Sequence, residues 1–339
     1  MKKAPFAVVC VAALALAACS SSKPDEDKSA ASDNASAASS QAAVDKASKN
    51  YDLQFVQGVQ GDEFYITMQC GIEEEARKLG VTVHTQGPTK FDPTLQKPIV
   101  DSVVSAKPDA LLVAPTDVKA MQGPLNQAKA AGVKVVLVDT TVDDPSVAVS
   151  AIASDNLGGG KAAFEAIQKL APQGGKVLAM GVTPGISTTD LRAKGFEDAV
   201  KADSKFKYVG IQYSNNDPAT ASQLISAALQ KDPDIVGVFA LNLFSAEGTA
   251  TGIKQSGKSG KIQVVGFDAG PNQVAALRAG TVQALIAQQP AEIGKFGVDA
   301  AVASLDGGQV TAKVQTGFTI LTKDNIDGDG AKAIYKSKC

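Results

Sequence analysis

The residues best suited to binding a small polar molecule follow a series of short apolar segments. Six such segments, among them LQFVQGV, VKVVLVD and VGVFAL, are each followed by side chains that include carboxylate, amide or aromatic groups. Carboxylates and amides form paired hydrogen bonds with neighbouring hydroxyl groups, and aromatic rings cover C–H surfaces. One Asp or Asn after a strand is commonly a helix cap, but six at successive positions indicate a site for a sugar or a polyol.

Strands that alternate with helices are expected to position these polar and aromatic residues. Short β-branched runs such as ALLVAP and KVLAMGV alternate with segments of helical spacing such as GKAAFEAIQKLAP, several of which end in Gly or Pro. Buried strands separated by amphipathic helices are typical of parallel sheets with helices on both faces, so we predict an α/β protein. In such proteins ligands bind beyond the carboxyl ends of the strands. Residues 51–339 are long enough for two domains.

The N-terminal sequence MKKAPFAVVCVAALALAACSSS predicts export. Two Lys residues precede a short apolar run, and the run ends in small residues. This pattern is typical of a signal peptide over residues 1–18. The end of this run, LAAC, resembles the bacterial lipobox and predicts a lipid on Cys19. Plain signal cleavage is the alternative, and it leaves Cys19 without a role. Residues 19–50, rich in Ser, Ala and Asp, are expected to be a flexible tether.

Charge and cysteine content restrict the partners and the compartment. The formal net charge is -2 with Lys and Arg interspersed among Asp and Glu, so no basic patch for nucleic acid is expected. Once Cys10 leaves with the signal and Cys19 takes a lipid, Cys70 and Cys339 remain. They form a disulfide in an oxidising compartment, or Cys70 is buried and Cys339 is a free terminal thiol; spacing alone does not separate these alternatives.

The order of the motifs resembles that of periplasmic sugar-binding proteins of the ribose-binding type. The likeness runs from Leu53 to Leu321 and is carried most specifically by SAIASDN and VVGFD. It implies two Rossmann-like lobes, joined by three crossings, that clamp a ligand by hinge closure. Crossings are expected near residues 154–155, 288–290 and 316–319. The N-terminal lobe would then comprise 51–154 and 289–317, and the C-terminal lobe 155–288 and 318–339.

The same resemblance implies ten ligand-binding positions. They are Asp62, Phe64, Tyr65, Asp139, Thr140, Asp190, Asn216, Asn242, Asp268 and Gln288. Four of them depart from the ribose-type pattern. Asp62 stands where that pattern has Asn, Thr140 and Asp190 stand where it has Arg, and Asn216 replaces an aromatic residue.

These departures change the expected ligand. Without the two Arg residues the cleft lacks guanidinium groups and holds four carboxylates, those of Asp62, Asp139, Asp190 and Asp268. An anion is therefore disfavoured, and we expect a neutral ligand with many hydroxyl groups or a cationic amino sugar. Loss of the ring at Asn216 favours another aldose, a polyol or a less planar sugar over ribose. Arg192 is expected to brace Glu197 or Asp198 on its own helix, with the cleft as the alternative.

Three other motifs suggest chemistry that the sequence does not complete. His84 is the only histidine, and a lone His cannot assemble a zinc site or a catalytic triad. The glycine run 158–160 lacks the ending of a phosphate-binding loop, so we expect close helix packing there. The segment NIDGDG, 325–330, begins like a calcium loop, but Lys336 stands where Glu is required. We expect no metal and no cofactor.

Together these features predict a solute-binding lipoprotein at the outer face of the cell membrane or in the periplasm. It would be a monomer that captures a sugar or polyol and delivers it to the permease of an ABC transporter. A sensory protein that presents its closed form to a membrane receptor is the alternative. A further alternative is a secreted glycan hydrolase with paired Asp residues. The lack of a nucleophile motif or of a set of metal ligands argues against it. A DNA-binding regulator is excluded, because the lobes follow a lipidated tether.

Overall fold

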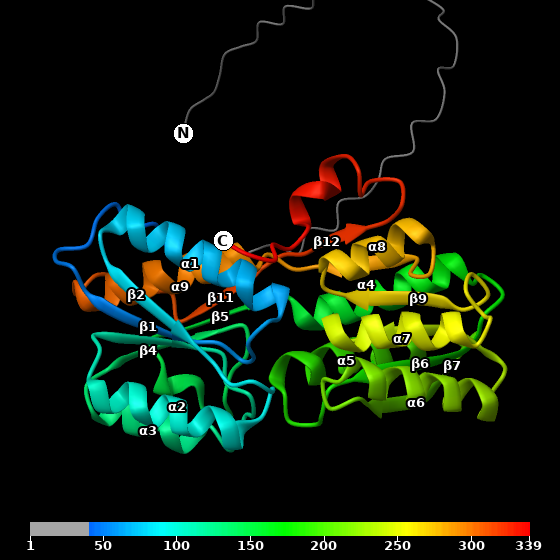
Figure 1. Cartoon of the computed structure of the whole chain (residues 1–339), viewed down its shortest axis with the longest axis horizontal. Helices are drawn as coiled ribbons and strands as arrows, with labels where there is room; N and C mark the ends of the chain where they lie inside the picture. The colour runs from blue at the N-terminus through cyan, green and yellow to red at the C-terminus, as the bar shows by residue number, and fades with distance from the viewer. Residues whose placement is uncertain (1–40) are drawn as a thin grey trace, which may run out of the picture. The chain divides into compact units, whose positions relative to one another are not determined.

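The computed structural model describes residues 41–339, so the predicted signal peptide, Cys19 and most of the predicted tether lie outside the described residues. In the described part, strands and helices alternate along the chain and build two six-stranded sheets (Figure 1). The predicted α/β class is confirmed. No helix among residues 41–339 has the length and hydropathy to cross a membrane.

The first sheet belongs to the N-terminal lobe and is entirely parallel. In their order across the sheet, its strands are β11 Lys313–Thr316, β5 Ser150–Ser154, β4 Lys134–Val138, β3 Ala110–Val113, β1 Asp52–Val56 and β2 Thr82–Gln86. Helices cover both faces, with α1 Glu63–Leu79 and α9 Pro290–Leu305 on one and α2 Pro93–Ala106 and α3 Gln122–Ala130 on the other (Figure 1). A short helix, η1 Pro145–Val147, precedes β5.

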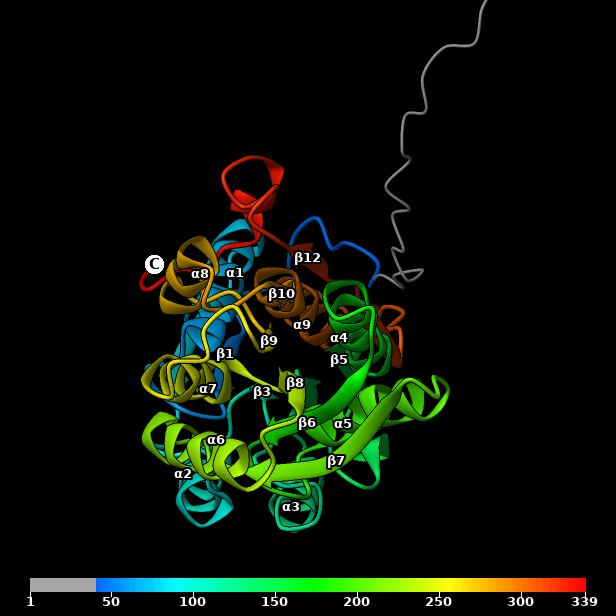
Figure 2. The same ribbon diagram turned by 90° about the vertical axis from the view of Figure 1, so that its right-hand side faces the viewer.

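The second sheet belongs to the C-terminal lobe and ends in one antiparallel strand, β12. In their order across the sheet, its strands are β12 Thr319–Leu321, β10 Ala284–Ala287, β9 Gln263–Phe267, β8 Ile235–Ala240, β6 Gly175–Gly181 and β7 Phe206–Tyr213. In Figure 2 its helices lie on both sides of the strands. They are α4 Asn156–Leu170 and α5 Ser187–Lys201 on one side, and α6 Pro218–Lys231, α7 Leu243–Gln255 and α8 Pro271–Ala279 on the other.

The apolar runs in the sequence become strands because helices exclude water from both of their faces. Every residue of β3, sequence ALLV, and of β10, sequence ALIA, is buried. The edge strand β2, sequence TVHTQ, alternates half-buried and exposed residues, and His84 lies on it. This contrast follows from position, since central strands of a covered parallel sheet have no solvent face.

Three short segments connect the lobes, and the lobes also contact each other directly. Chain crossings lie between β5 and α4, between β10 and α9, and between β11 and β12. Across the gap, the backbone N–H of Val118 donates to the carbonyl of Gly185 at 3.1 Å. The N–H of Thr141 donates to the hydroxyl of Ser187 at 2.9 Å. The lobes are therefore closed against each other.

The described end of the predicted tether, residues 41–50, packs on the N-terminal lobe. Gln41 accepts a hydrogen bond from the N–H of Thr311 at 3.0 Å, and the N–H of Ser48 donates to Asp306 at 3.1 Å. Ala47 is buried, and its N–H donates to the carbonyl of Leu79. A flexible tether was expected for all of 19–50, but these paired polar groups and apolar contacts order its last ten residues.

Candidate ligand-binding site

A cavity lies between the lobes at the carboxyl ends of strands from both sheets. We call it the interlobe cavity. It is lined by Asp62, Phe64, Tyr65, Phe91, Asp139, Val182, Ile186, Thr188, Thr189, Arg192, Asn216, Asn242, Asp268 and Gln288. Eight of the ten positions implied by the sequence resemblance are therefore brought together, and two of them, Thr140 and Asp190, are not.

On the N-terminal lobe, the wall of the cavity begins at the first turn of α1. Asp62 is the N-cap of α1 and accepts a hydrogen bond from the N–H of Phe64 at 2.8 Å, so the cap and the cavity wall are the same residue. The rings of Phe64 and Tyr65 meet edge to face, with centroids 5.2 Å apart. Both residues are buried. The half-buried Phe91, which precedes α2, adds a third ring.

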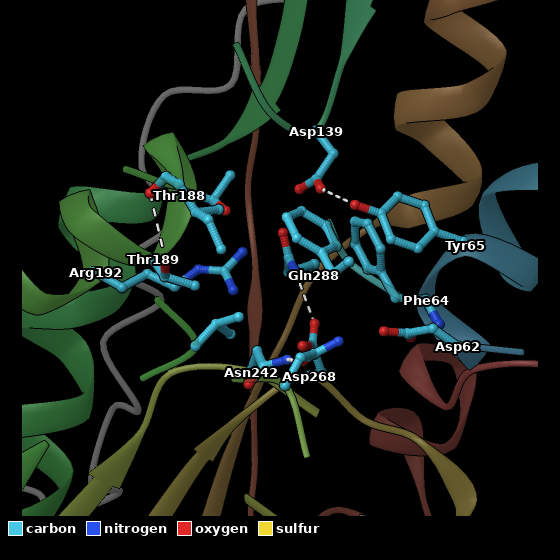
Figure 3. A pocket seen from close by; sticks show the side chains of 14 residues that line it. Asp62, Phe64, Tyr65, Asp139, Thr188, Thr189, Arg192, Asn242, Asp268 and Gln288 are labelled. Carbon is cyan, nitrogen blue, oxygen red and sulfur yellow. Dashed lines mark hydrogen bonds between the residues drawn. The ribbon is translucent and has the colours of Figure 1, made fainter. Parts of the chain in front are cut away.

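Asp139 follows β4 and points into the cavity from the same lobe (Figure 3). Its Oδ2 accepts a hydrogen bond from the hydroxyl of Tyr65 at 2.8 Å. Burial raises the pKa of Asp139 to about 6, against the opposing effects of Arg192 and of the Tyr65 hydroxyl. Burial, together with Asp139, also raises the pKa of Tyr65 well above its usual value, so this phenol stays a neutral donor.

Asp268 follows β9 and takes the corresponding place on the C-terminal lobe. Its Oδ1 accepts hydrogen bonds from Gln288 Nε2 at 2.7 Å and from the hydroxyl of Tyr335 at 3.0 Å. Its Oδ2 accepts a hydrogen bond from the N–H of Leu243 at 3.0 Å. Gln288 lies at a crossing, and its Oε1 accepts a hydrogen bond from Ser154 Oγ at 2.7 Å. Gln288 at one crossing therefore holds this carboxylate, and Ser154 at another crossing holds Gln288.

Two amides complete the polar lining of the C-terminal lobe. Asn242 caps α7, because its Oδ1 accepts a hydrogen bond from the N–H of Ser245 at 3.2 Å. Its Nδ2 donates to Oδ1 of Asn216 at 2.7 Å. An amide keeps both donors and acceptors to offer, so this pair can bind hydroxyl groups in either direction.

Arg192 is a lining residue for which the sequence interpretation is wrong. It is only 3% exposed, and its guanidinium points toward the middle of the cavity (Figure 3). Its Nε donates to Asn156 Oδ1 and its Nη1 to the carbonyl of Leu241, both at 2.8 Å. The guanidinium carbon lies 3.7 Å from the centroid of the Phe267 ring. These contacts hold the cation rigidly in a buried position.

The expected partners of Arg192 are occupied by other residues. Glu197 pairs with Lys201, and Asp198 pairs with Lys194. The buried face of α5 instead carries Thr188, Thr189, Arg192, Gly195 and Phe196. That helical spacing of buried positions is the sequence signal that could have placed Arg192 inside.

The glycine run 158–160 has the packing role that we expected for it. A side chain at Gly160 would overlap the backbone carbonyl of Arg192, and one at Gly159 would overlap the ring of Phe267. The absence of a side chain at Gly160 lets α4 lie directly against α5, and its absence at Gly159 leaves room for the Phe267 ring at the end of β9. This close approach fixes the helix that carries Arg192.

The two remaining positions lie outside the interlobe cavity for different reasons. Asp190 is exposed on α5 and accepts a hydrogen bond from the N–H of Gly185 at 2.9 Å. Thr140 is buried in the wall of a neighbouring pocket beside the first crossing. It follows Asp139, whose φ of 65° lies in the left-handed region. That turn of the backbone directs Asp139 into the cavity and Thr140 out of it.

The charges in the cavity favour a neutral or cationic ligand. Three buried carboxylates, Asp62, Asp139 and Asp268, surround one buried cation, Arg192. Burial is the largest cause of the raised pKa of each carboxylate, and for Asp62 the charge of Asp268 adds to it. The expected absence of any guanidinium is wrong, but an anion still meets an excess of carboxylates. Among residues 41–339, no group of His, Cys, Asp or Glu side chains is arranged to hold a metal.

Comparison with known proteins decides the family. A family model described as "Periplasmic binding protein domain" matches residues 53–309. The chain belongs to this family. The periplasmic binding protein is 31% identical over 323 residues to the ribose import binding protein RbsB of Bacillus subtilis (strain 168), which covers 95% of this chain and 100% of the relative.

Solved structures of the family superpose closely on this periplasmic binding protein. One is an ABC transporter solute-binding protein from Agrobacterium vitis bound with α-D-tagatopyranose, with a TM-score of 0.83, 38% identity, and coverage of 85% of this chain and 100% of that one. A second from Agrobacterium vitis, with bound D-fucose, has a TM-score of 0.80, 29% identity, and coverage of 84% and 100%. The predicted resemblance to ribose-type binding proteins is thereby confirmed.

Proposed function

We propose that this periplasmic binding protein captures one neutral monosaccharide or polyol in the interlobe cavity and delivers it to an ABC importer. The observation that carries the proposal is the lining itself. The buried carboxylates of Asp139 and Asp268 and the half-buried amide of Asn242 face the same space as the rings of Phe64 and Phe91. The polar groups suit a ring of hydroxyls, and the aromatic rings suit the C–H surface of a sugar.

The relatives support the sugar class without fixing the sugar. Their names and titles give ribose import, bound tagatopyranose and bound fucose, all monosaccharides. Arg192 can donate to sugar oxygens, while Asp139 accepts from hydroxyls, so the cavity suits a polyhydroxy compound that both donates and accepts. We expect retention of the sugar without turnover.

We also propose that the mature protein is exported, lipid-anchored through Cys19 and monomeric. The signal-like run and the LAAC motif support the anchor. Residues 41–50 pack on the N-terminal lobe, so the residues that precede them are joined to the protein at that lobe. Mass spectrometry of the membrane fraction tests the lipid. A diacylated N-terminal Cys19 is expected, and an unmodified mature N-terminus would contradict the proposal.

A thermal-shift screen of the soluble body, residues 41–339, tests the binding function. The ligands are D-tagatose, D-fucose, D-ribose, D-allose, mannitol and glucosamine. A ligand that binds only the folded state raises the melting temperature. We expect at least one neutral sugar or polyol to do so. No shift with any sugar or polyol, or a shift with glucosamine alone, would contradict the proposal.

A further inference from the structure

The C-terminal residues belong to neither lobe alone. The chain leaves β12 of the C-terminal lobe, forms the short helix η2 Asp329–Ala333, and ends beside α1 of the N-terminal lobe (Figure 1). We call residues 329–339 the C-terminal strap. Cys339 at its end forms a disulfide with Cys70 on α1, with the two Cα atoms 5.3 Å apart. The strap is therefore a fourth covalent connection between the lobes.

Hydrogen bonds hold the strap to both lobes. On the C-terminal lobe, the N–H of Tyr335 donates to the carbonyl of Ala269 at 3.0 Å. On the N-terminal lobe, the N–H of Lys336 donates to the hydroxyl of Thr67, one turn before Cys70 on α1, at 2.7 Å. Two consecutive residues of the strap thus bond to different lobes.

Tyr335 connects the strap to the interlobe cavity. It is 4% exposed, and its hydroxyl accepts a hydrogen bond from the N–H of Gln288 at 2.9 Å while donating to Asp268 Oδ1 at 3.0 Å. Its ring lies 6.0 Å, centroid to centroid, from that of Phe64. One side chain therefore contacts a crossing, a cavity carboxylate of one lobe and a cavity ring of the other. It does so from behind the lining, without facing the cavity.

We propose that Tyr335 is a positioning residue for the sugar site, held in place by the Cys70–Cys339 disulfide; this rests on the proposed function. A carboxylate oxygen has two acceptor positions, and both positions of Asp268 Oδ1 are filled, by Gln288 and Tyr335. The plane of the carboxylate is thereby fixed. Its Oδ2, with one donor from Leu243, keeps an acceptor position for a sugar hydroxyl.

The protonation state of Tyr335 suits this role. Burial and the charge of Asp268 raise the pKa of the Tyr335 phenol well above its usual value. The phenol is therefore neutral near neutral pH and can donate to Asp268. A Phe at this position would keep the contact with Phe64 and lose only the hydroxyl.

The disulfide has a separate effect on binding. With Cys339 fixed to α1, the strap is ordered before a sugar arrives, and Tyr335 lies against Asp268 in the free protein. Without the disulfide, part of the binding free energy would be spent on ordering the strap and closing the lobes. A weaker affinity is therefore expected even though no atom of the cavity lining changes.

Three variants test the proposal by calorimetry with D-tagatose, or with whichever sugar gives the largest thermal shift. Tyr335→Phe is expected to weaken affinity about tenfold, through loss of one charge-assisted hydrogen bond. The double variant Cys70→Ser with Cys339→Ser is expected to weaken it in the same direction. Lys338→Ala, an exposed position on the strap, is the matched control and should bind as the wild type does.

Hydrogen exchange at the Gln288 amide provides a readout that needs no sugar, because the Tyr335 hydroxyl accepts this N–H. Faster exchange at Gln288 with weaker binding in Tyr335→Phe supports the proposal. Wild-type affinity in Tyr335→Phe, with faster exchange at Gln288, would overturn the role of Tyr335 alone. A wild-type protein that binds no sugar would overturn the proposed function and this role with it.

Discussion

Each lobe places an Asp at the corresponding position in the cavity wall, directly after a strand, but the two carboxylates are held by different numbers of hydrogen bonds. Asp139 follows β4 and Asp268 follows β9, with φ of 65° and 80°. The backbone N–H of each donates to the neighbouring strand, to the carbonyl of Ile152 at 2.8 Å and to that of Ile286 at 2.9 Å. Backbone strain of this kind persists only where the surrounding structure holds it, and it concentrates at functional sites.

The side chains of these two residues differ in how many donors they already have. Asp268 accepts hydrogen bonds from Gln288, Tyr335 and the N–H of Leu243, whereas Asp139 accepts one, from Tyr65. The C-terminal lobe therefore presents a carboxylate fixed in advance. The N-terminal lobe presents one with acceptor positions left for the ligand. We propose from this difference that Asp268 orients the sugar and that Asp139 adjusts to it.

Removing Asp268 should have the largest effect, and on stability. Asp268→Ala leaves three buried donors unpaired and removes a carboxylate that offsets the charge of Arg192. We expect the free energy of unfolding to fall by about 3 to 5 kcal/mol. Asp139→Ala, which leaves only the Tyr65 hydroxyl unpaired, should cost about 1 to 3 kcal/mol. Urea unfolding of both variants measures the difference, and equal losses would remove the contrast between the lobes.

The pH dependence of stability should reflect Asp139. Its pKa is about 6 in the folded protein, against an ordinary value of 3.8 for Asp, so the folded state binds this proton more tightly. Stability from this group is therefore full below about pH 4 and is lost as pH rises to about 6, by on the order of 3 kcal/mol. The drop should be smaller in Asp139→Asn, although Asp62 and Asp268 still titrate in the same direction.

Urea unfolding of the wild type and of Asp139→Asn at about pH 4.5 and pH 7 measures this pH-dependent contribution to the free energy of unfolding. The variant has its own stability offset, so the comparison uses the difference between the two pH values within each protein. An identical pH difference in both proteins would show that Asp139 is not the responsive carboxylate.

Sugar affinity should depend on Asp139 more than on any residue outside the cavity. Asp139→Ala removes an acceptor that a sugar hydroxyl would use, so calorimetry should show about tenfold to hundredfold weaker binding. Asp190→Ala is the matched control. The sequence resemblance implied Asp190 as a ligand-binding residue as well, but its side chain is exposed outside the cavity.

Asp190→Ala should have the smallest effect of the series. Its carboxylate accepts one hydrogen bond, from the N–H of Gly185 at the surface, so we expect an affinity within about twofold of wild type and a stability change within about 0.5 kcal/mol. A large loss of affinity in this variant would instead show that α5 turns Asp190 toward the ligand.

Several site residues could be predicted because local chemistry and site chemistry coincide. Asp62 and Asn242 each follow a strand and cap the next helix, so the strand-end pattern locates them. The alternative interpretation of such residues as helix caps is also right, since Asp62 and Asn242 each cap a helix and line the interlobe cavity. The two-lobed fold could be predicted from its buried strands and the order of its motifs.

The orientations of other residues in or near the site depend on structure that the local sequence around each residue does not determine. Whether Thr140 faces the cavity depends on the left-handed backbone at Asp139, and the sequence carries no Gly or Asn there to signal it. The direction of Arg192 depends on which face of α5 is buried. Tyr335 reaches Asp268 across 67 positions of the chain, through a strap whose path only the folded structure defines.

A crystal structure of the protein with its best-binding sugar tests the central claim most directly. We predict one sugar in the interlobe cavity, with hydroxyl groups hydrogen-bonded to both Asp139 and Asp268 and with its C–H surface against the rings of Phe64 or Phe91. A sugar bound elsewhere, or one in the cavity that contacts neither carboxylate, would contradict the account.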